Sequence, residues 1–366
     1  MRMKMKMKTL LGILLIVLLS LGSLPMVGAQ EEGVESVCLV TGGGRVNDGT
    51  FNQFAYEGML RAEEDFDLDV IAIEPQAPSD FPGAIDTCVQ EGFDVVISVG
   101  FTIYDDTLAA AEANPDTYFI GVDHFDTGGL PNYVGLDFRD DQAGFLMGVM
   151  AALVTETDII AAVYGPNDPQ VVRFRSGYEQ GAHYINPDIE VKGVHLDSYE
   201  DPVNGASTAS QYLGEGADVV FGVGGPTGTG AIALAAEEGA WVIGVDQDEF
   251  MTSFNEGETP GGDRIISSAI KRIDNAVYAM LEVLVAGDME NFPGGSNFVS
   301  DASNGGIDFA PQHDADIPPE VHEQVREVLD LLASGDIETG VDPLSGELLD
   351  EMDMDMAPEA TEEADS

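Results

Sequence analysis

The side chains in this chain that could bind a ligand or take part in a reaction gather directly after apolar runs rich in valine and isoleucine. They are carboxylates, amides, aromatic rings and one lysine, namely Asp48, Phe51, Asn52, Phe101, Asp123, Asn167, Asp168, Asp246 and Lys271, and they are joined by a glycine-rich segment at 224–228 that contains Gly225. A pocket that combines aromatic faces with a few convergent polar groups binds small polar ring compounds. We therefore expect a site for a small molecule, built from several loops.

A catalytic role would need a reactive constellation that the sequence does not provide. No serine stands in a Gly-x-Ser-x-Gly elbow, and the five histidines are scattered without the spacing of metal ligands. Asp123 and Asp246 could form a carboxylate pair that hydrolyses a glycosidic bond. An aspartate at the end of a strand more often caps a helix or accepts a hydroxyl hydrogen bond. We therefore expect a binding protein that is not an enzyme and carries no metal.

Two glycine-rich loops invite a nucleotide interpretation. Segment 41–45 is similar to the phosphate loop of short-chain dehydrogenases, but the Tyr-x-x-x-Lys pair of those enzymes is missing, since Asp188 and Ser267 stand four residues before Lys192 and Lys271. Segment 222–228 lacks the Gly-Lys-Ser/Thr ending of a phosphate-cradling loop. Pro226 also removes a backbone donor from that segment. We expect no dinucleotide or other cofactor.

The pattern of apolar runs predicts the elements that must position these residues. The runs cover residues 37–40, 70–73, 95–99, 118–122, 159–163, 191–195, 219–223, 241–245 and 265–270, with segments of helical length between them. Runs flanked by Gly, Asp and Pro indicate parallel strands that are buried on both faces. The predicted fold class is α/β with doubly wound parallel sheets, in which ligands bind beyond the carboxyl ends of the strands.

An internal repeat divides the chain into two similar lobes. GFDVVISVG at 92–100 is matched by GADVVFGVG at 216–224, and FIGVD ending at Asp123 is matched by VIGVD ending at Asp246. We expect the late strand and helix at 264–290 to return to the first lobe. The predicted N-terminal lobe is then 34–139 plus 264–290, and the predicted C-terminal lobe is 140–263 plus 291–340. Three strands would cross between the lobes and form a hinge.

The first 29 residues have the features of a secretory signal. Arg2 and three lysines precede an apolar run at 10–19, and small residues at 27–29 suit a cleavage site. The run is short of the roughly 20 residues that a spanning helix needs, so an uncleaved anchor is only the alternative. No cysteine follows the signal to carry a lipid. We expect export to the periplasm or to the extracellular face of the cell membrane.

The charge of the chain is strongly negative. The 67 acidic residues outnumber the 14 basic ones and give a net charge of -53. Such a surface repels nucleic acid and anionic lipid head groups. Because 44% of the residues are hydrophobic, we expect a globular protein with an acidic surface, as in salt-adapted organisms, and not a disordered chain. Residues 341–366 are predicted to be a disordered acidic tail, with a Met-rich metal site as the alternative.

Cysteine and lysine are both rare enough to interpret one by one. Cys38 and Cys88 allow a single disulfide, but the interpretation that we favour is two small buried apolar side chains. Beyond the signal, Lys192 and Lys271 are the only lysines. Lys271 ends a predicted strand that faces the proposed cleft. So scarce a lysine is expected to have a local role at that cleft, and we expect a surface role for Lys192.

The segment NDGTFNQ at 47–53, followed by Glu57 and Gly58, resembles the opening motif of the basic membrane protein family, the purine nucleoside-binding proteins of ABC importers. The resemblance continues through 99–101, 114–116, 119–123, 139–148, 173–177, 225–230, 244–246 and 268–272, and covers most of residues 35–310. It implies a fold like that of type I periplasmic binding proteins. The missing lipid-anchor cysteine, the acidic surface and the acidic tail depart from the family's pattern, and they concern attachment and environment rather than the pocket.

The resemblance also implies roles for single residues. Phe51 and Phe174 would stack on a base, and Asp48, Asn52 and Asp123 would bind its polar edge. Lys271, paired with Asp246, would hold the ribose hydroxyls. Gly225 would allow a close backbone approach, and Phe101 is a further candidate for ligand binding. An anionic nucleotide would meet several carboxylates, so a neutral purine nucleoside is expected. The protein would act as a monomer that docks to a membrane permease. A binder of a sugar or other small metabolite, or a nucleoside hydrolase, are the alternatives.

Overall fold

The computed structural model describes residues 33–349. The predicted signal at 1–29 lies outside the described residues, as does the predicted tail from residue 350 onward. Residues 341–349 are described and have defined structure, because Val341 and Leu348 pair in an antiparallel bridge. The predicted start of the tail at residue 341 is therefore too early. No helix in the described part of the chain is long and apolar enough to cross a membrane.

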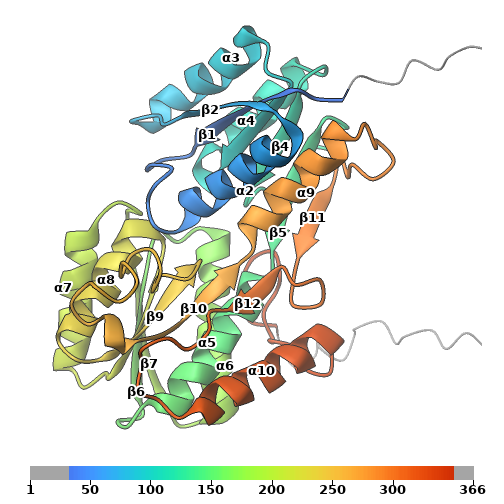
Figure 1. The fold of residues 1–366 in the computed structure, drawn as a ribbon. Helices are drawn as coiled ribbons and strands as arrows, with labels where there is room; N and C mark the ends of the chain where they lie inside the picture. Colours follow the sequence, from blue (N-terminus) through green and yellow to red (C-terminus); the bar gives the residue numbers. More distant parts are fainter. Residues whose placement is uncertain (1–32, 350–366) are drawn as a thin grey trace, which may run out of the picture. The chain divides into compact units, whose positions relative to one another are not determined.

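Two six-stranded sheets of equivalent strand order form the frame of the protein (Figure 1). The first sheet has the order β11 (Asn297–Ser300), β5 (Tyr133–Phe138), β4 (Tyr118–Val122), β3 (Val95–Val99), β1 (Ser36–Thr41) and β2 (Asp69–Ile73). The second has the order β12 (Ile307–Phe309), β10 (Ile265–Lys271), β9 (Trp241–Asp246), β8 (Val219–Val223), β6 (Ile159–Tyr164) and β7 (Glu190–His195). Neighbouring strands pair in parallel, except for the antiparallel pair β10 and β12. The predicted α/β fold class is confirmed.

Helices connect these strands and cover the sheets, as the buried apolar runs require. Between the strands of the first sheet, the chain forms α2 (Phe51–Phe66), α3 (Phe81–Glu91) and α4 (Tyr104–Ala113), with the short helices η1 (Pro78–Asp80) and η2 (Phe101–Ile103). Between the strands of the second sheet, it forms α6 (Pro169–Ile185), α7 (Pro202–Gly214) and α8 (Gly225–Glu237), with the short helix η3 (Gly262–Arg264). The remaining helices are α5 (Asp140–Val154), α9 (Ile273–Val285) and α10 (Pro319–Ser334). All five residues of β3 and of β8 are buried, which is typical of strands covered on both faces.

The structure differs from the predicted lobe boundaries after residue 264. Strand β10 pairs with β9 and belongs to the second sheet, whereas β11 pairs with β5 and belongs to the first. Only the helix of the segment 264–290 fits the prediction, because α9 packs against α2 beside the first sheet. The repeat explains the arrangement. β10 is the fifth strand of the second copy, as β5 is of the first, and the helix that follows each fifth strand packs on the opposite lobe.

The two crossing helices, α5 and α9, begin in the same way. The Arg139 guanidinium donates two hydrogen bonds of 2.8 Å to the Asp141 carboxylate, and Arg272 donates bonds of 2.9 and 2.8 Å to Asp274. Each of these aspartates lies under a glycine of the helix that its own helix packs against: a Cβ on Gly58 would be 2.5 Å from the Asp274 carbonyl oxygen, and one on Gly177 would be 2.1 Å from that of Asp141. Only glycine permits this helix contact.

The chain crosses between the lobes three times within the described residues. The crossings lie at 138–140, at 271–273 and between β11 and β12, at 300–307. They are joined by backbone hydrogen bonds, from the Arg139 amide to the Ser300 carbonyl and from the Arg272 amide to the Gly306 carbonyl, both 2.9 Å. One of the crossings therefore begins at the predicted site residue Lys271, and another ends at Asp140.

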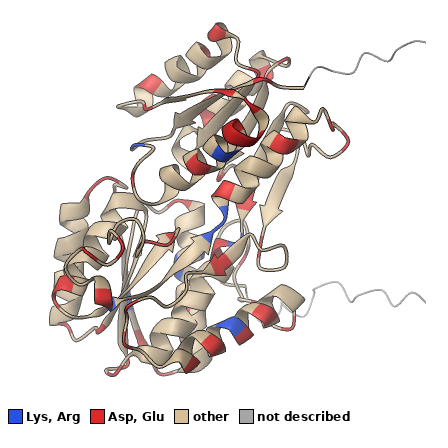
Figure 2. Ribbon diagram, viewed as in Figure 1, with Lys and Arg blue, Asp and Glu red and all other residues tan. Residues whose placement is uncertain are grey.

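The two cysteines are joined, contrary to the interpretation that we favoured. Cys38 on β1 and Cys88 on α3 form a disulfide with a Cα–Cα distance of 5.8 Å, and both residues are fully buried. The sequence could not decide this, because a buried thiol and a buried disulfide follow the same apolar pattern. Figure 2 shows acidic residues along the helices and loops of both lobes, with few basic residues among them.

Candidate functional site

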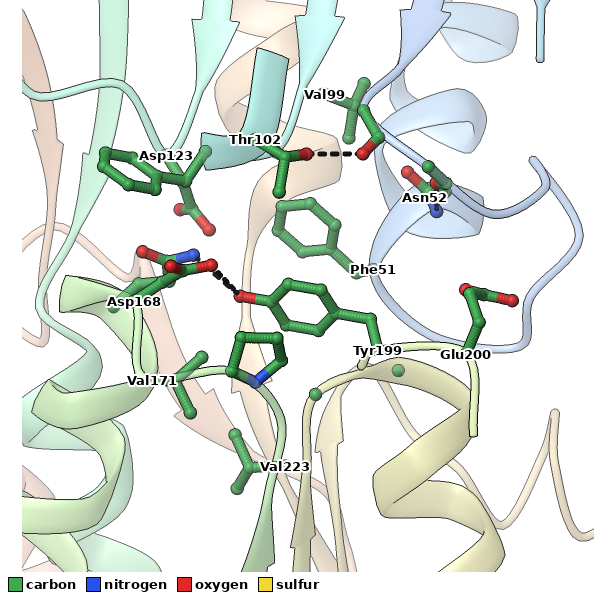
Figure 3. A pocket seen from close by; sticks show the side chains of 18 of the residues that line it. Phe51, Asn52, Val99, Thr102, Asp123, Asp168, Val171, Tyr199, Glu200 and Val223 are labelled. Carbon is green, nitrogen blue, oxygen red and sulfur yellow. Dashed lines mark hydrogen bonds between the residues drawn. The ribbon is translucent and has the colours of Figure 1, made fainter. Parts of the chain in front are cut away.

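One cavity brings together the nine residues that were predicted to bind the ligand; of the two other loop residues considered, Asp168 lines it and Asn167 does not. Its volume is about 530 Å³, which lies within the range of small-molecule pockets. Its lining includes Asp48, Phe51, Asn52, Phe101, Asp123, Phe174, Gly225, Asp246 and Lys271. These residues follow strands of both sheets, so the cavity lies where the carboxyl ends of the two sheets supply their loops, as doubly wound folds require (Figure 3).

The loop after β1 is organised by Asp48. Its carboxylate accepts hydrogen bonds from the backbone amides of Thr50, Asn52 and Gln53 at 2.9 to 3.1 Å, and one from the Asn52 side chain at 2.9 Å. Burial raises the pKa of Asp48, although these four bonds oppose the shift. Asp48 therefore acts first as the organiser of the N-terminus of α2, and it places Phe51 and Asn52 at the cavity.

Asp123 and Asp246 occupy equivalent positions at the ends of β4 and β9. Both have a left-handed backbone, with φ of 62° and 67°, a conformation that costs free energy for a residue with a side chain. Both side chains are buried. Burial raises the pKa of Asp123 to about 6, with Lys271 opposing the shift, and raises the pKa of Asp246 well above its usual range. The duplicated fold thus places two buried carboxyl groups, each on a strained backbone, in the lining of one cavity.

Lys271 lies at the centre of the charged groups. Its Nζ is 2.7 Å from Asp123 Oδ1 and 2.9 Å from Asp140 Oδ1, and its side chain is 1% exposed. Burial alone would lower the pKa of Lys271, but the carboxylates of Asp123, Asp140 and Asp246 outweigh it and raise the pKa. The expected pairing with Asp246 is replaced by Asp123 and Asp140, because Asp246 acts on the ammonium from a greater distance without an ion-pair contact.

Aromatic rings surround the ammonium of Lys271. The centroids of the Phe138, Phe51 and Phe174 rings lie 4.9, 5.4 and 5.8 Å from Nζ. Distances of this size allow cation–π attraction. Phe101 stands further along the wall and stacks on Phe125 at a centroid distance of 5.8 Å. The cavity therefore combines one buried cation with flat apolar faces, as the loop composition predicted.

Tyr199 is the main lining residue that the sequence reasoning missed. It lies in the loop between β7 and α7, and its hydroxyl donates a hydrogen bond of 2.7 Å to Asp168 Oδ2 (Figure 3). The adjacent Glu200 lines the cavity too, as does Gln170, whose amide lies 3.3 Å from the Tyr199 hydroxyl. The loop carries no family motif, but it follows the predicted strand 191–195. The rule that ligands meet the ends of strands would have pointed to it.

The loops of the two lobes also meet beside the cavity. The Gln247 side-chain amide donates a 3.0 Å hydrogen bond to the Thr50 carbonyl, and the Thr252 hydroxyl donates one of 2.7 Å to the Gly49 carbonyl. Both bonds join the loop after β9 to the loop after β1. Loops that follow strands of the two different sheets are thus held against each other.

The site offers no evident reactive pair among the described residues. His124, the histidine next to Asp123, contacts the Tyr133 hydroxyl through Nδ1 and the Gly100 carbonyl through Nε2, the latter at 3.0 Å. Burial lowers its pKa to about 4, so it stays neutral at physiological pH. Within residues 33–349 no group of three or more His, Cys, Asp or Glu side chains could hold a metal ion. The arrangement can hold a ligand by stacking and hydrogen bonding.

The fold and the cavity define a solute-binding protein of the type I periplasmic kind. The chain superimposes on an ABC transporter solute-binding protein from Aeropyrum pernix K1 with a TM-score of 0.69 and 26% identity, covering 83% of this chain and 92% of that chain. It matches the fold of a second one, from Conexibacter woesei DSM 14684, with a TM-score of 0.67 and 24% identity over 83% of this chain and 97% of that one.

The sequence comparisons identify the family. The chain belongs to the Bmp family, the PnrA-like ABC transporter substrate-binding proteins, which matches residues 35–337. It is 30% identical to the ABC transporter nucleoside-binding protein BmpA of Lactococcus lactis subsp. cremoris, over 74% of this chain and 80% of that protein. It is 31% identical to basic membrane protein A of Borreliella burgdorferi, over 72% of this chain and 77% of that protein. The predicted family is confirmed, and the protein is an ABC transporter solute-binding protein.

Proposed function

We propose that this protein is the exported binding component of an ABC importer and captures a neutral purine nucleoside in the cavity described above. The observation that carries the proposal is the position of Lys271, whose ammonium lies between Asp123 and Asp140 beside the rings of Phe51 and Phe174. A flat base and a vicinal diol need an aromatic face next to fixed hydrogen-bonding charges. Both are present within one cavity.

The proposed roles divide the ligand between the two kinds of groups. Phe51 and Phe174 stack on the base, while Asn52 and the aspartates at the cavity wall bind its polar edge. Lys271 and Asp246 hold the ribose hydroxyls, and Gly225, with a φ of 60°, lets the backbone approach the ligand. Stacking contributes roughly 1–3 kcal/mol per base, and each hydrogen bond to a charged group about 1.5–3 kcal/mol. After ordering costs, this is enough for micromolar or tighter binding.

The charge of the cavity favours a neutral ligand over a nucleotide. Asp48, Asp123, Asp168, Glu200 and Asp246 all line it, whereas Lys271 is the only basic residue among the described residues of its lining. A phosphate would meet this excess of carboxyl groups at short range. A nucleoside instead presents N–H and O–H donors, which carboxylates accept. The Lactococcus lactis relative is named a nucleoside-binding protein, which supports the same ligand class.

Isothermal titration calorimetry with a panel of ligands tests the proposal. The mature protein is titrated with inosine, guanosine, adenosine, ribose and guanosine monophosphate, after removal of co-purified ligand and its identification by mass spectrometry. We expect micromolar or tighter binding of a purine nucleoside and much weaker binding of ribose and the nucleotide. The absence of binding by all nucleosides would refute the proposal. Binding of ribose alone would favour the sugar-binding alternative, and release of free base would indicate a hydrolase.

Transport is the second part of the proposal. We propose that the protein is monomeric, is exported by its first 29 residues and delivers its ligand to the membrane permease of the importer. The family membership supports this part, since ABC transporter substrate-binding proteins serve a membrane partner. Deletion of the gene should abolish uptake of the radiolabelled nucleoside that the purified protein binds, and complementation should restore it. Unchanged uptake would contradict the importer role while leaving the binding role intact.

A further inference from the structure

Arg173 on α6 is a fully buried arginine that does not line the cavity. Its guanidinium donates two hydrogen bonds to Asp140 Oδ2, at 3.1 Å from Nε and 2.7 Å from Nη2, and Nη2 is also 3.2 Å from Asp137 Oδ1. The guanidinium carbon lies 4.5 Å from the centroid of the Phe125 ring. Burying such a charge costs several kcal/mol unless its partners are well placed. The packing of α6 on α5 alone does not require it.

Asp140, the first residue of α5, links Arg173 to the cavity. The two oxygens of its carboxylate have different partners. Oδ2 accepts hydrogen bonds from Arg173, and Oδ1 lies 2.9 Å from the Lys271 ammonium nitrogen. The side chains of all three residues are 0 or 1% exposed. Because Arg173 holds one oxygen with two donors, the other oxygen has a fixed direction. The position of Lys271 Nζ therefore depends on Arg173 through Asp140.

The third side of the guanidinium is held by the last described segment, residues 339–349, which we call the C-terminal clasp. Arg173 Nη1 donates a 2.7 Å hydrogen bond to the Pro343 carbonyl, and the Ser176 hydroxyl donates one of 2.6 Å to the Gly346 carbonyl. Thr339 donates a further bond to Asp141 Oδ2 at 2.5 Å. The clasp contributes no residue to the lining of the cavity. It leaves the guanidinium no freedom to turn away from Asp140.

Charge balance gives Arg173 a second effect on Lys271. The buried groups include two cations, Arg173 and Lys271, against the carboxyls of Asp123, Asp137 and Asp140. Without the guanidinium, Asp137 and Asp140 would lose a counter-charge, and Asp140 would attract the ammonium more strongly in a site with little water to screen the charges. The lysine would then be drawn away from a ligand that shares its donors.

We propose that Arg173 is a positioning residue for ligand binding. The C-terminal clasp holds Arg173, and Arg173 orients the Asp140 carboxylate. Asp140 in turn fixes the position of the Lys271 ammonium, which binds the ligand's hydroxyls. This inference rests on the proposed nucleoside function. It assigns a role in binding to a residue and a segment that do not touch the ligand.

A double-mutant cycle on ligand affinity tests the proposal. Arg173→Met should weaken binding of the preferred nucleoside about tenfold in the otherwise unchanged protein, and by less than about twofold when Lys271 is already methionine. Arg173→Lys, which keeps a charge near Asp140, should recover part of the loss. The equivalent change Arg175→Met, at a half-exposed arginine on the same helix, should leave affinity unchanged. Equal losses with and without Lys271 would overturn the proposal.

Two further variants keep the test independent of folding. Asp140→Asn has nearly the same volume and removes the link itself, so its effect should likewise depend on Lys271. A Cβ at residue 346 would lie 2.7 Å from the Arg173 amide nitrogen, so Gly346→Ala should displace the clasp and reproduce a weaker form of the same loss. The variants should also lose preference for a ribonucleoside over its 2′-deoxy analogue, whereas a purely structural defect would weaken both equally. If the unaltered protein binds no nucleoside, the proposed function fails and not this coupling.

Discussion

Lys271 Nζ and Asp123 Oδ1 lie 2.7 Å apart, although the two residues stand at the ends of strands in different sheets. Asp123 follows β4 of the first sheet, and Lys271 ends β10 of the second. Lys271 also stands directly before the crossing at 271–273. An ion pair between the two lobes therefore lies at the point where the chain passes from one to the other. Any ligand that shares the donors of this ammonium acts on both lobes at once.

Replacement of Lys271 by methionine should weaken nucleoside binding by at least tenfold. Methionine keeps the apolar stem but removes the donors that bind the ligand's hydroxyls, which corresponds to a loss of about 1.4 kcal/mol or more. The variant should still fold, because Asp123, whose pKa is already raised to about 6, can take up a proton when the ammonium is gone. Calorimetric titration and a thermal melt of the same preparation measure the two effects separately.

Lys192 provides the matched control for this change. It is the other lysine beyond the predicted signal, and it pairs with Glu190 and Glu215 at the protein surface, 2.6 and 3.1 Å away. Lys192→Met should leave the affinity unchanged and should change the stability only slightly, because exposed ion pairs contribute little. If Lys192→Met and Lys271→Met weaken binding equally, the assignment of Lys271 to the site is wrong.

The sequence was sufficient for the frame and for the inner wall of the cavity. The internal sequence repeat at 92–100 and 216–224 predicted two equivalent sheets. The residues that follow the strands of these sheets meet in one cavity. It was not sufficient for strand partners, since an apolar run at 265–270 indicates a strand without indicating its sheet. The repeat nevertheless held the answer, because β10 stands in the second copy where β5 stands in the first.

Ion-pair partners were the other part that the sequence could not supply. Lys271 pairs with Asp140 across 131 positions of the chain, and Arg173 reaches the Pro343 carbonyl. The first contact depends on how β10 meets α5, and the second on how the C-terminal clasp packs on α6. No pattern of residue types encodes a distance between two such elements. Tyr199 was missed for a different reason, since we judged its loop by motifs and not by its place after a strand.

Glu249 should make the stability of the protein fall as the pH rises from about 4.5 to 7. Burial raises the pKa of Glu249 to about 7, while hydrogen bonds from the Val245 amide and the Thr229 hydroxyl oppose the shift. The folded protein therefore binds a proton in this range that the unfolded chain has lost, and ionising Glu249 at higher pH costs roughly 3 kcal/mol. Urea denaturation at pH 5 and pH 8 measures the difference.

The variant Glu249→Gln isolates this effect from other titrating groups. His124 has a pKa lowered to about 4 by burial, so it works in the opposite direction between pH 4 and 6.5. It contributes equally to both proteins and cancels in the comparison. Relative to the unaltered protein, Glu249→Gln should gain stability at pH 8 and not at pH 5. The exposed Glu237→Gln should show no such change, and an equal pH dependence in all three proteins would contradict the prediction.

The Cys38–Cys88 disulfide should stabilise the protein without affecting its ligand. It closes a loop across 50 positions, and the restriction of the unfolded chain corresponds to roughly 4 kcal/mol. Neither cysteine lines the cavity. The double replacement by serine should therefore lower the free energy of unfolding by about 3–4 kcal/mol and leave nucleoside affinity within twofold. Two free thiols in the oxidised, denatured protein would show that the bond does not form.

Salt should stabilise the protein, because it has a net charge of -53 and the excess carboxylates on the folded surface repel one another. The screening length falls from about 10 Å at 0.1 M salt to about 3 Å at 1 M, so most of the repulsion should vanish over that range. The melting temperature should rise steadily with KCl between these concentrations. Sucrose, which stabilises folded states by exclusion without screening charges, serves as the control and should give a smaller rise. A melting temperature independent of KCl would mean that the acidic residues spread over both lobes in Figure 2 carry no repulsive cost in the folded state.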